Sequence, residues 1–271
     1  MPHKLFRHFG RYLFLLLLFL VPFLRNALAP DMIGNSAYAY LILDFGGVYS
    51  TKSVDFMTLI LSVVPNLLLI YAFSDVMRED CMTSYVYVFT RMAKKQKWLL
   101  RKAEQLFVNV LTVYLLLYAL AFAIAWTVKL TFSGFSVSVF LMLATMLLLN
   151  VLSLFFMVYL QNFLSLHYGG TQAFLITMLL YLIPLAVGLV FYNSSIVGNL
   201  ILGLFIPTNQ MYLWHADCLS VPGAEMLLDN PLHGFKCTFS LVILCAYILL
   251  EYCISRHIFL TRDTVELMKE E

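Results

Sequence analysis

The sequence predicts an all-helical protein that crosses a membrane about six times, and its composition and its apolar runs both support this fold class. Of the 271 residues, 62% are hydrophobic and only 12% are charged. A soluble domain of this size carries charges at about a quarter of its positions, so the natural solvent of most of this chain is lipid. Because no soluble domain interrupts the apolar runs, residues 1–271 are predicted to form a single transmembrane domain.

Six stretches supply the roughly 20 mostly apolar residues that a helix needs to cross a bilayer. They are residues 12–29, 56–76, 106–130, 137–164, 173–192 and 235–255. A seventh apolar run, residues 196–206, is too short to span, so we expect a re-entrant or interfacial helix there that ends at Pro207. The segments 30–55 and 193–234 are then the two long outer loops.

Lysine and arginine residues indicate the orientation of these spans. If the N-terminus is inside, the inner segments hold 13 of the 17 lysines and arginines. Cytoplasmic segments of membrane proteins carry this excess of positive charge. The chain is therefore expected in the cell membrane with both termini in the cytoplasm and its surface against membrane lipids. The net charge of +2 gives no reason to expect a nucleic-acid partner.

The first residues have the pattern of an amphipathic helix. Lys4, Arg7 and Arg11 fall on one helical face, and apolar side chains populate the other. Such a helix is expected to lie at the inner membrane interface before the chain turns into the first span. The alternative is a basic flank that the topology alone requires.

The inner loop between the second and third spans, residues 77–105, combines an apolar stripe with a basic cluster. Spacing of i, i+3, i+4 and i+7 predicts one helical face, made of Tyr85, Val88, Phe89 and Met92. Lys94, Lys95 and Trp98 follow, and a tryptophan among lysines is typical of a chain that re-enters lipid. The stripe favours a helix that docks a cytoplasmic partner, and an anchor for anionic lipid is the alternative.

Residues 84–118, within this six-span pattern, resemble the stretch between spans two and three of a known family. The family is the permease subunits of type-two ABC transporters, the polypeptide and polysaccharide exporter class, in their small bacterial six-span form. The resemblance implies export of peptides, antibiotics or lipid-like molecules by two six-span permeases of the same or similar sequence. It also implies that residues from Tyr85 to Trp98 form the coupling helix that docks in the ATPase. The inner loop near residues 167–172 departs from the pattern, since it is short and carries no lysine or arginine.

The ATPase is expected on a separate subunit, because the sequence lacks the phosphate-binding loop GxxxxGK[ST]. Motifs of intramembrane proteases are also missing, so no enzymatic activity, catalytic residue, cofactor or metal site is predicted. The second function hypothesis is a non-transporting membrane anchor or an interaction subunit of a membrane complex. Such a protein needs the same spans and basic flanks but no ATPase.

A few polar residues lie within or beside the spans. Glu251 is expected to pair with Arg256 or a loop lysine, while polar loop residues explain His215 and Asp217 better than a metal site does. Cys218 and Cys237 both fall near the outer side, where a disulfide is chemically allowed. Five amides are expected to form hydrogen bonds between helices: Asn66, Asn109, Asn150, Gln161 and Asn162.

Overall fold

The computed structural model describes most of the chain, and the described part consists of helices joined by turns and short irregular stretches. The described residues are 2–28, 35–47, 56–81, 95–132, 136–191, 196–218, 232 and 234–261. The side chains of residues 2–9, 11, 12, 56–59, 61, 196, 197 and 200 lie outside that description. Within these ranges the one extended contact is an isolated bridge between Ser36 and Thr131. The all-helical fold class is therefore confirmed.

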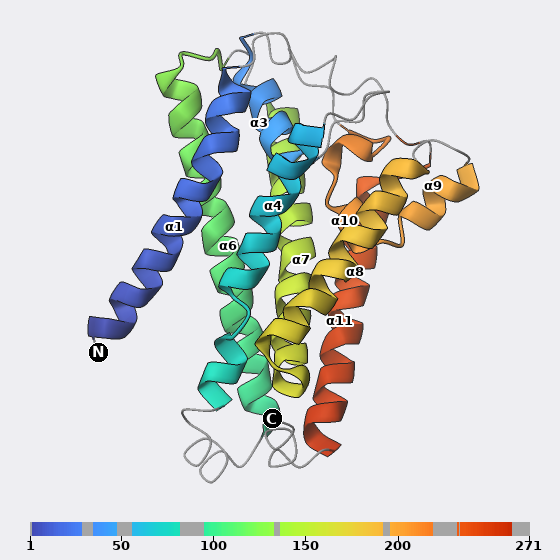
Figure 1. Ribbon diagram of the computed structural model, residues 1–271. Coiled ribbons are helices and arrows are strands. Elements are labelled where there is room, and N and C mark those ends of the chain that lie inside the picture. Colours follow the sequence, from blue (N-terminus) through green and yellow to red (C-terminus); the bar gives the residue numbers. More distant parts are fainter. Residues whose placement is uncertain are drawn as a thin grey trace.

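Six helices coincide with the six predicted spans (Figure 1). They are α1 (Pro2–Ala27), α4 (Phe56–Ala72), α6 (Lys95–Thr127), α7 (Val137–Tyr168), α8 (Gly170–Val190) and α11 (Cys237–Thr261). Four of them, α6, α7, α8 and α11, are long and apolar enough to cross a membrane, while the apolar part of α1, Leu13–Ala27, is shorter. The chain is thus a helical membrane protein with several membrane-embedded helices.

Helix α7 is the centre of the bundle. It contacts α4, α6, α8 and α11 as well as two short helices, α3 (Ala37–Phe45) and α10 (Ile206–Asn209). Only Gly169 separates α7 from α8, and its φ of 77° suits a residue without a side chain. The predicted inner loop at residues 167–172 is therefore reduced to a single-residue reversal of the chain.

Two ends of the bundle are distinguished by their charges and by the short helices. The basic end holds Arg78, Arg256 and the first turns of α6, which carry Lys95, Lys97, Arg101 and Lys102. The α3 end, at the opposite side of Figure 1, holds α3, α9 (Ile196–Leu202), α10 and the 3-10 turn η1 (Tyr212–Trp214). With 33 residues at about 1.5 Å each, α6 is about 50 Å long. It thus exceeds the roughly 30 Å hydrocarbon layer, and its basic turns lie beyond the apolar part.

The N-terminal segment is helical as predicted, but it does not turn before the first span. Helix α1 runs without interruption from Pro2 to Ala27, and it diverges from the bundle toward its N-terminus (Figure 1). Gly10 lies inside this helix; a single glycine lowers helix stability by about 1 kcal/mol but does not by itself end a helix. The prediction of a separate interfacial helix followed by a turn is corrected to one continuous helix.

The predicted outer loop at residues 30–55 contains the buried helix α3. Ser36 caps the N-terminus of α3, where its side chain accepts a hydrogen bond from the Ala39 N–H. Gly46 caps the C-terminus, where its N–H donates to the Ile42 carbonyl. Phe45 stacks on Tyr118 of α6 with ring centroids 3.9 Å apart. All but one of the nine residues of α3 are buried, so this segment belongs to the core of the α3 end.

The short helix predicted at residues 196–206 is found as α9, but Pro207 has a different place. Instead of ending a helix, Pro207 stands in the first turn of α10, a position that proline tolerates because its missing N–H is not needed there. The chain then continues through η1, whose Leu213 N–H donates to the Gly46 carbonyl at 3.0 Å. This contact packs the segment before α11 against the end of α3.

Candidate functional site

The structure describes part of the predicted docking site. Lys95 is the first residue of α6 and is half-buried. The stripe Tyr85, Val88, Phe89 and Met92, together with Lys94, lies outside the described residues. The backbone at Lys4, Arg7 and Arg11 is helical in α1, and the three side chains lie outside the description.

Trp98 lies inside the bundle and not at its surface. Its side chain is 3% exposed and its ring stacks on Phe259 of α11, with centroids 5.4 Å apart and planes 16° apart. A residue so buried does not reach a docked partner. The role expected for Trp98 is therefore corrected from a contact residue to one that fixes the start of α6 against α11.

An ion pair links the chain before segment 82–94 to the helix after it. Lys102 Nζ lies 2.6 Å from the carboxylate of Asp80, which precedes the segment. Lys102 also donates to the Gln105 side chain at 2.8 Å. Because α6 begins immediately after the segment, any force on residues 82–94 acts on α6 and on the chain that follows α4.

Asn162 of α7 binds the chain at the point where α4 ends. Its Nδ2 donates to the Phe73 carbonyl at 2.5 Å, and its Oδ1 accepts from the Met77 N–H at 3.0 Å. A turn at residues 73–75 separates α4 from a second helical stretch, residues 76–81. Asn162 is fully buried, so this amide fixes the helix break and confirms the predicted bond between helices.

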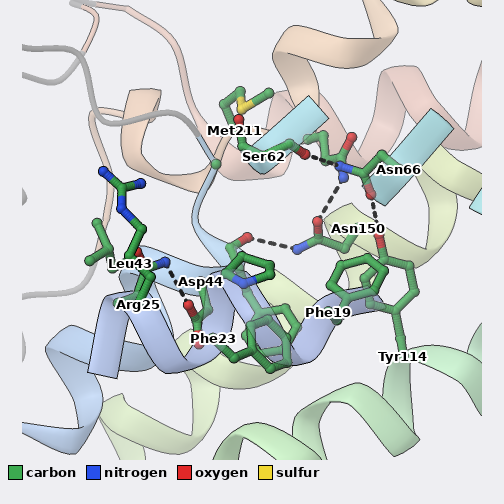
Figure 2. A pocket seen from close by; sticks show the side chains of 15 residues that line it. Phe19, Phe23, Arg25, Leu43, Asp44, Ser62, Asn66, Tyr114, Asn150 and Met211 are labelled. Atoms are coloured by element: carbon green, nitrogen blue, oxygen red, sulfur yellow. Dashed lines mark hydrogen bonds between the residues drawn. The ribbon is translucent and has the colours of Figure 1, made fainter. Parts of the chain in front are cut away.

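A polar cavity of about 60 Å³ lies at the α3 end, between α1, α3, α4, α6 and α7 (Figure 2). Its polar lining residues are Arg25, Asn26, Asp44, Ser62, Asn66, Tyr114, Asn150 and Gln210. A polar cavity of this size has room for a few water molecules and is far too small for a peptide. Its size therefore rules it out as a conduit for a large substrate.

Hydrogen bonds between distant segments form the walls of this cavity. Tyr114 of α6 donates to Asn66 of α4 at 3.3 Å, and Gln210 donates to the Asn150 side chain at 2.9 Å. Asn150 donates to the Phe45 carbonyl at 2.9 Å, which joins α7 to the end of α3. The predicted bonds between helices are thus confirmed at Asn66 and Asn150. Asn109 also forms an interaction, and Gln161 donates to the Gly170 carbonyl at 3.3 Å.

Asp44 is the acidic residue of the cavity. The sequence did not indicate it, because its helix is too short to be recognised as a span. It stands in α3, outside the spanning helices, and accepts a hydrogen bond from Asn26 of α1 at 2.8 Å (Figure 2). Burial raises the pKa of the Asp44 carboxyl well above its ordinary value, and the Asn26 bond opposes this only in part. A protonated Asp44 can donate as well as accept hydrogen bonds within the cluster.

Glu251 has a different environment from the one expected. Its side chain is 7% exposed, and both carboxyl oxygens lack a hydrogen-bond partner among the described residues. Arg256, the expected partner, is exposed, since five residues along a helix place it on another face. One turn from Glu251, Ser255 is hydrogen-bonded to Tyr159 of α7 at 2.7 Å. The predicted ion pair with Arg256 is wrong, and Glu251 faces α7 inside the bundle; of the loop lysines, Lys94 lies outside the described residues.

The polar residues around His215 build a structural joint at the α3 end. His215 Nε2 lies 2.7 Å from the Ser240 hydroxyl of α11, and Nδ1 lies 3.2 Å from the Tyr212 carbonyl. The Asp217 carboxylate accepts the N–H of Cys237, the first residue of α11, at 2.7 Å. His215 and Asp217, the side chains considered for a metal site, are thus engaged in hydrogen bonds. The described residues contain no group of three or more candidate metal ligands.

Comparison with known proteins assigns the chain to a family. Residues 13–265 match the model of the family DUF2705, described as a protein of unknown function. The chain belongs to the DUF2705 family. No curated protein and no solved structure matches it significantly.

The DUF2705 match covers the whole bundle, from the apolar part of α1 through the end of α11. It includes the cavity residues, the His215 joint and segment 82–94 with both of its flanks. Lys4, Arg7 and Arg11 precede the matched residues. The match therefore includes the six-helix bundle and the basic segment of this chain.

Proposed function

We propose that this DUF2705 protein is the membrane-spanning permease subunit of an ATP-driven exporter of the type-two ABC class, energised by a separate ATPase subunit. The observation that carries the proposal is the construction of the basic end. There, a segment with an apolar stripe and a basic flank emerges between two anchored helices, α4 and α6. A docking helix transmits work only if its ends are fixed to the elements that must move.

The contacts at the basic end supply such fixed ends. Before segment 82–94, Asn162 binds the break after α4, and after it Trp98 packs on α11. A push on the segment would therefore reach α4, α7 and α11 together. A membrane anchor that only rests on lipid does not need buried side-chain contacts on both sides of the segment that touches the lipid.

The proposed orientation and span number follow from the same arrangement. All six helices would cross the membrane, with the basic end in the cytoplasm, as positive charge on that side favours. The polar cavity is too small for a polypeptide, so the export pathway would lie between two permease chains. The functional unit is then a dimer of this chain or a pair with a similar six-span partner.

The test is co-purification of the ATPase with tagged full-length permease, combined with ATP hydrolysis by the complex. Truncating an aromatic anchor of an interface typically costs about 2 kcal/mol or more, a loss of about thirtyfold in affinity. Phe89→Ala and Tyr85→Ala should therefore lose the ATPase while the chain still inserts in the membrane. Replacing Lys94 and Lys95 with Gln should cause a milder, salt-sensitive loss of bound ATPase, because exposed charges contribute little to binding affinity.

The matched control is Phe140→Ala, because Phe140 is 60% exposed on α7. It should retain the ATPase fully. Unchanged ATPase retention and hydrolysis in both the Phe89 and the Tyr85 variants would remove the coupling role and favour the membrane-anchor hypothesis.

A further inference from the structure

Two short stretches of chain run side by side where α11 begins. The Ala216 N–H donates to the Phe235 carbonyl at 2.6 Å. Asp217 follows Ala216 directly, and its carboxylate accepts the N–H of Cys237, two residues after Phe235, at 2.7 Å. These two bonds hold the backbone next to Cys218 against the first residue of α11.

The arrangement brings two thiols into contact. The Cys218 thiol donates to the Tyr212 carbonyl at 2.9 Å, and the Cys237 side chain lies near enough to Cys218 to interact with it. Cys237 is buried and Cys218 is half-buried. A disulfide requires its two Cα atoms within about 7 Å, and two cysteines on neighbouring stretches joined by these hydrogen bonds fit that requirement.

A histidine completes the neighbourhood of the thiols. The His215 ring stacks on Phe235 with centroids 4.3 Å apart and lies against Cys237. Because both ring nitrogens already have polar neighbours, this cluster suits thiol chemistry better than metal binding.

We infer that Cys218 and Cys237 form a disulfide in the mature protein, which joins the chain before residue 219 to the first turn of α11. This inference rests on the proposed orientation, since the α3 end must face the side of the membrane where disulfides persist. It does not depend on an ATPase partner. The bond would close the segment 219–236 into a covalent loop at the α3 end.

The oxidant belongs to the class of disulfide-bearing thiol oxidases or oxidised low-molecular-weight thiols. The more exposed Cys218 thiolate attacks the oxidant disulfide, which forms a mixed disulfide and releases one thiolate. The Cys237 thiolate then attacks the Cys218 sulfur and releases the second thiolate. In total, two thiols lose two protons and two electrons, and one disulfide of the oxidant is reduced to two thiols.

The experiment uses full-length protein in membranes denatured with excess N-ethylmaleimide, which blocks every free thiol at once. Chymotrypsin cuts after Trp214 and Phe235, so it releases short peptides that each carry one of the two cysteines. Mass spectrometry without reductant should find these two peptides linked, two hydrogen atoms lighter than their sum. Both should be alkylated only after reduction.

The other cysteines provide the controls. Cys245 and Cys253 are exposed on α11 and should be alkylated without reduction. Cys245→Ser should leave the linked peptide unchanged, whereas Cys218→Ser should make Cys237 fully alkylated without reductant. Full alkylation of both Cys218 and Cys237 in the unreduced wild type, or a bond from either to another chain, would overturn the inference.

Discussion

Asn162 is the buried amide on which the basic end depends most directly. It is fully buried in α7 and takes part in three hydrogen bonds, to the Phe73 and Val158 carbonyls and from the Met77 N–H. Two of these bonds cross to the break after α4. Asn162→Ala removes them all and leaves the two backbone groups without the amide that binds them.

Two lines of reasoning give the size of the loss. A buried backbone group that loses its partner costs about 1–3 kcal/mol, and Asn162 binds two such groups on another segment. Hydrogen bonds between membrane helices average about 0.6 kcal/mol and reach about 1.7 kcal/mol, so the two bonds that leave α7 give about 1 kcal/mol on average and about 3 kcal/mol at most. Asn162→Ala should therefore lower the free energy of unfolding by about 2–4 kcal/mol.

The assay is reversible unfolding in mixed detergent micelles, followed by circular dichroism. Thr112→Ala is the control, because the exposed Thr112 hydroxyl bonds only to the Val108 carbonyl of its own helix. It should change the free energy of unfolding by less than about 0.5 kcal/mol, as surface substitutions usually do. An Asn162→Ala variant as stable as this control would refute the argument that the amide holds the break after α4.

Three further predictions concern the buried tryptophan, the cavity carboxyl and the orientation. Trp98→Ala should lower the free energy of unfolding by about 3 kcal/mol or more, as large core truncations do, while Trp126→Ala, at a residue 77% exposed, should have little effect in the same unfolding assay. Burial raises the pKa of Asp44, so its stabilising contribution is complete below the ordinary pKa of an aspartate and is lost as the pH rises through the raised pKa. The melting temperature of Asp44→Asn should match the wild type at low pH and exceed it at high pH, and parallel curves would contradict this. In a background without other cysteines, Lys95→Cys should resist an impermeant thiol reagent in intact cells and Ser220→Cys should react; the reverse pattern would refute the proposed orientation.

The spanning helices could be predicted because their signal is local. A run of about 20 apolar residues is sufficient to mark a span, and all six predicted stretches fall on helices. The helix α3 was missed because nine residues lie far below that length. Its local signals are the capping Ser36 and the glycine at 46, and both also occur in ordinary loops.

The sites were harder to predict because they depend on contacts between distant residues. Asn150 and Gln210 are 60 residues apart, and Tyr114 and Asn66 are 48 apart. Nothing in the local sequence distinguishes these amides from others in the spans. Trp98 shows the same limit, because a tryptophan among lysines fits a lipid interface as well as it fits a stack on Phe259.

The two polar clusters of the bundle are joined by one rigid element. Asn162 at the basic end and Asn150 at the cavity both belong to α7, twelve residues or about 18 Å apart. Between them, Ser153 bonds to the Ile206 carbonyl at the start of α10. Helix α7 is bonded to the break after α4 near one end and to the end of α3 near the other, so a shift of α7 alone would break both bonds. In the proposed exporter, a movement imposed on segment 82–94 would therefore reach the α3 end through α7, and the buried amides are the contacts through which it would act.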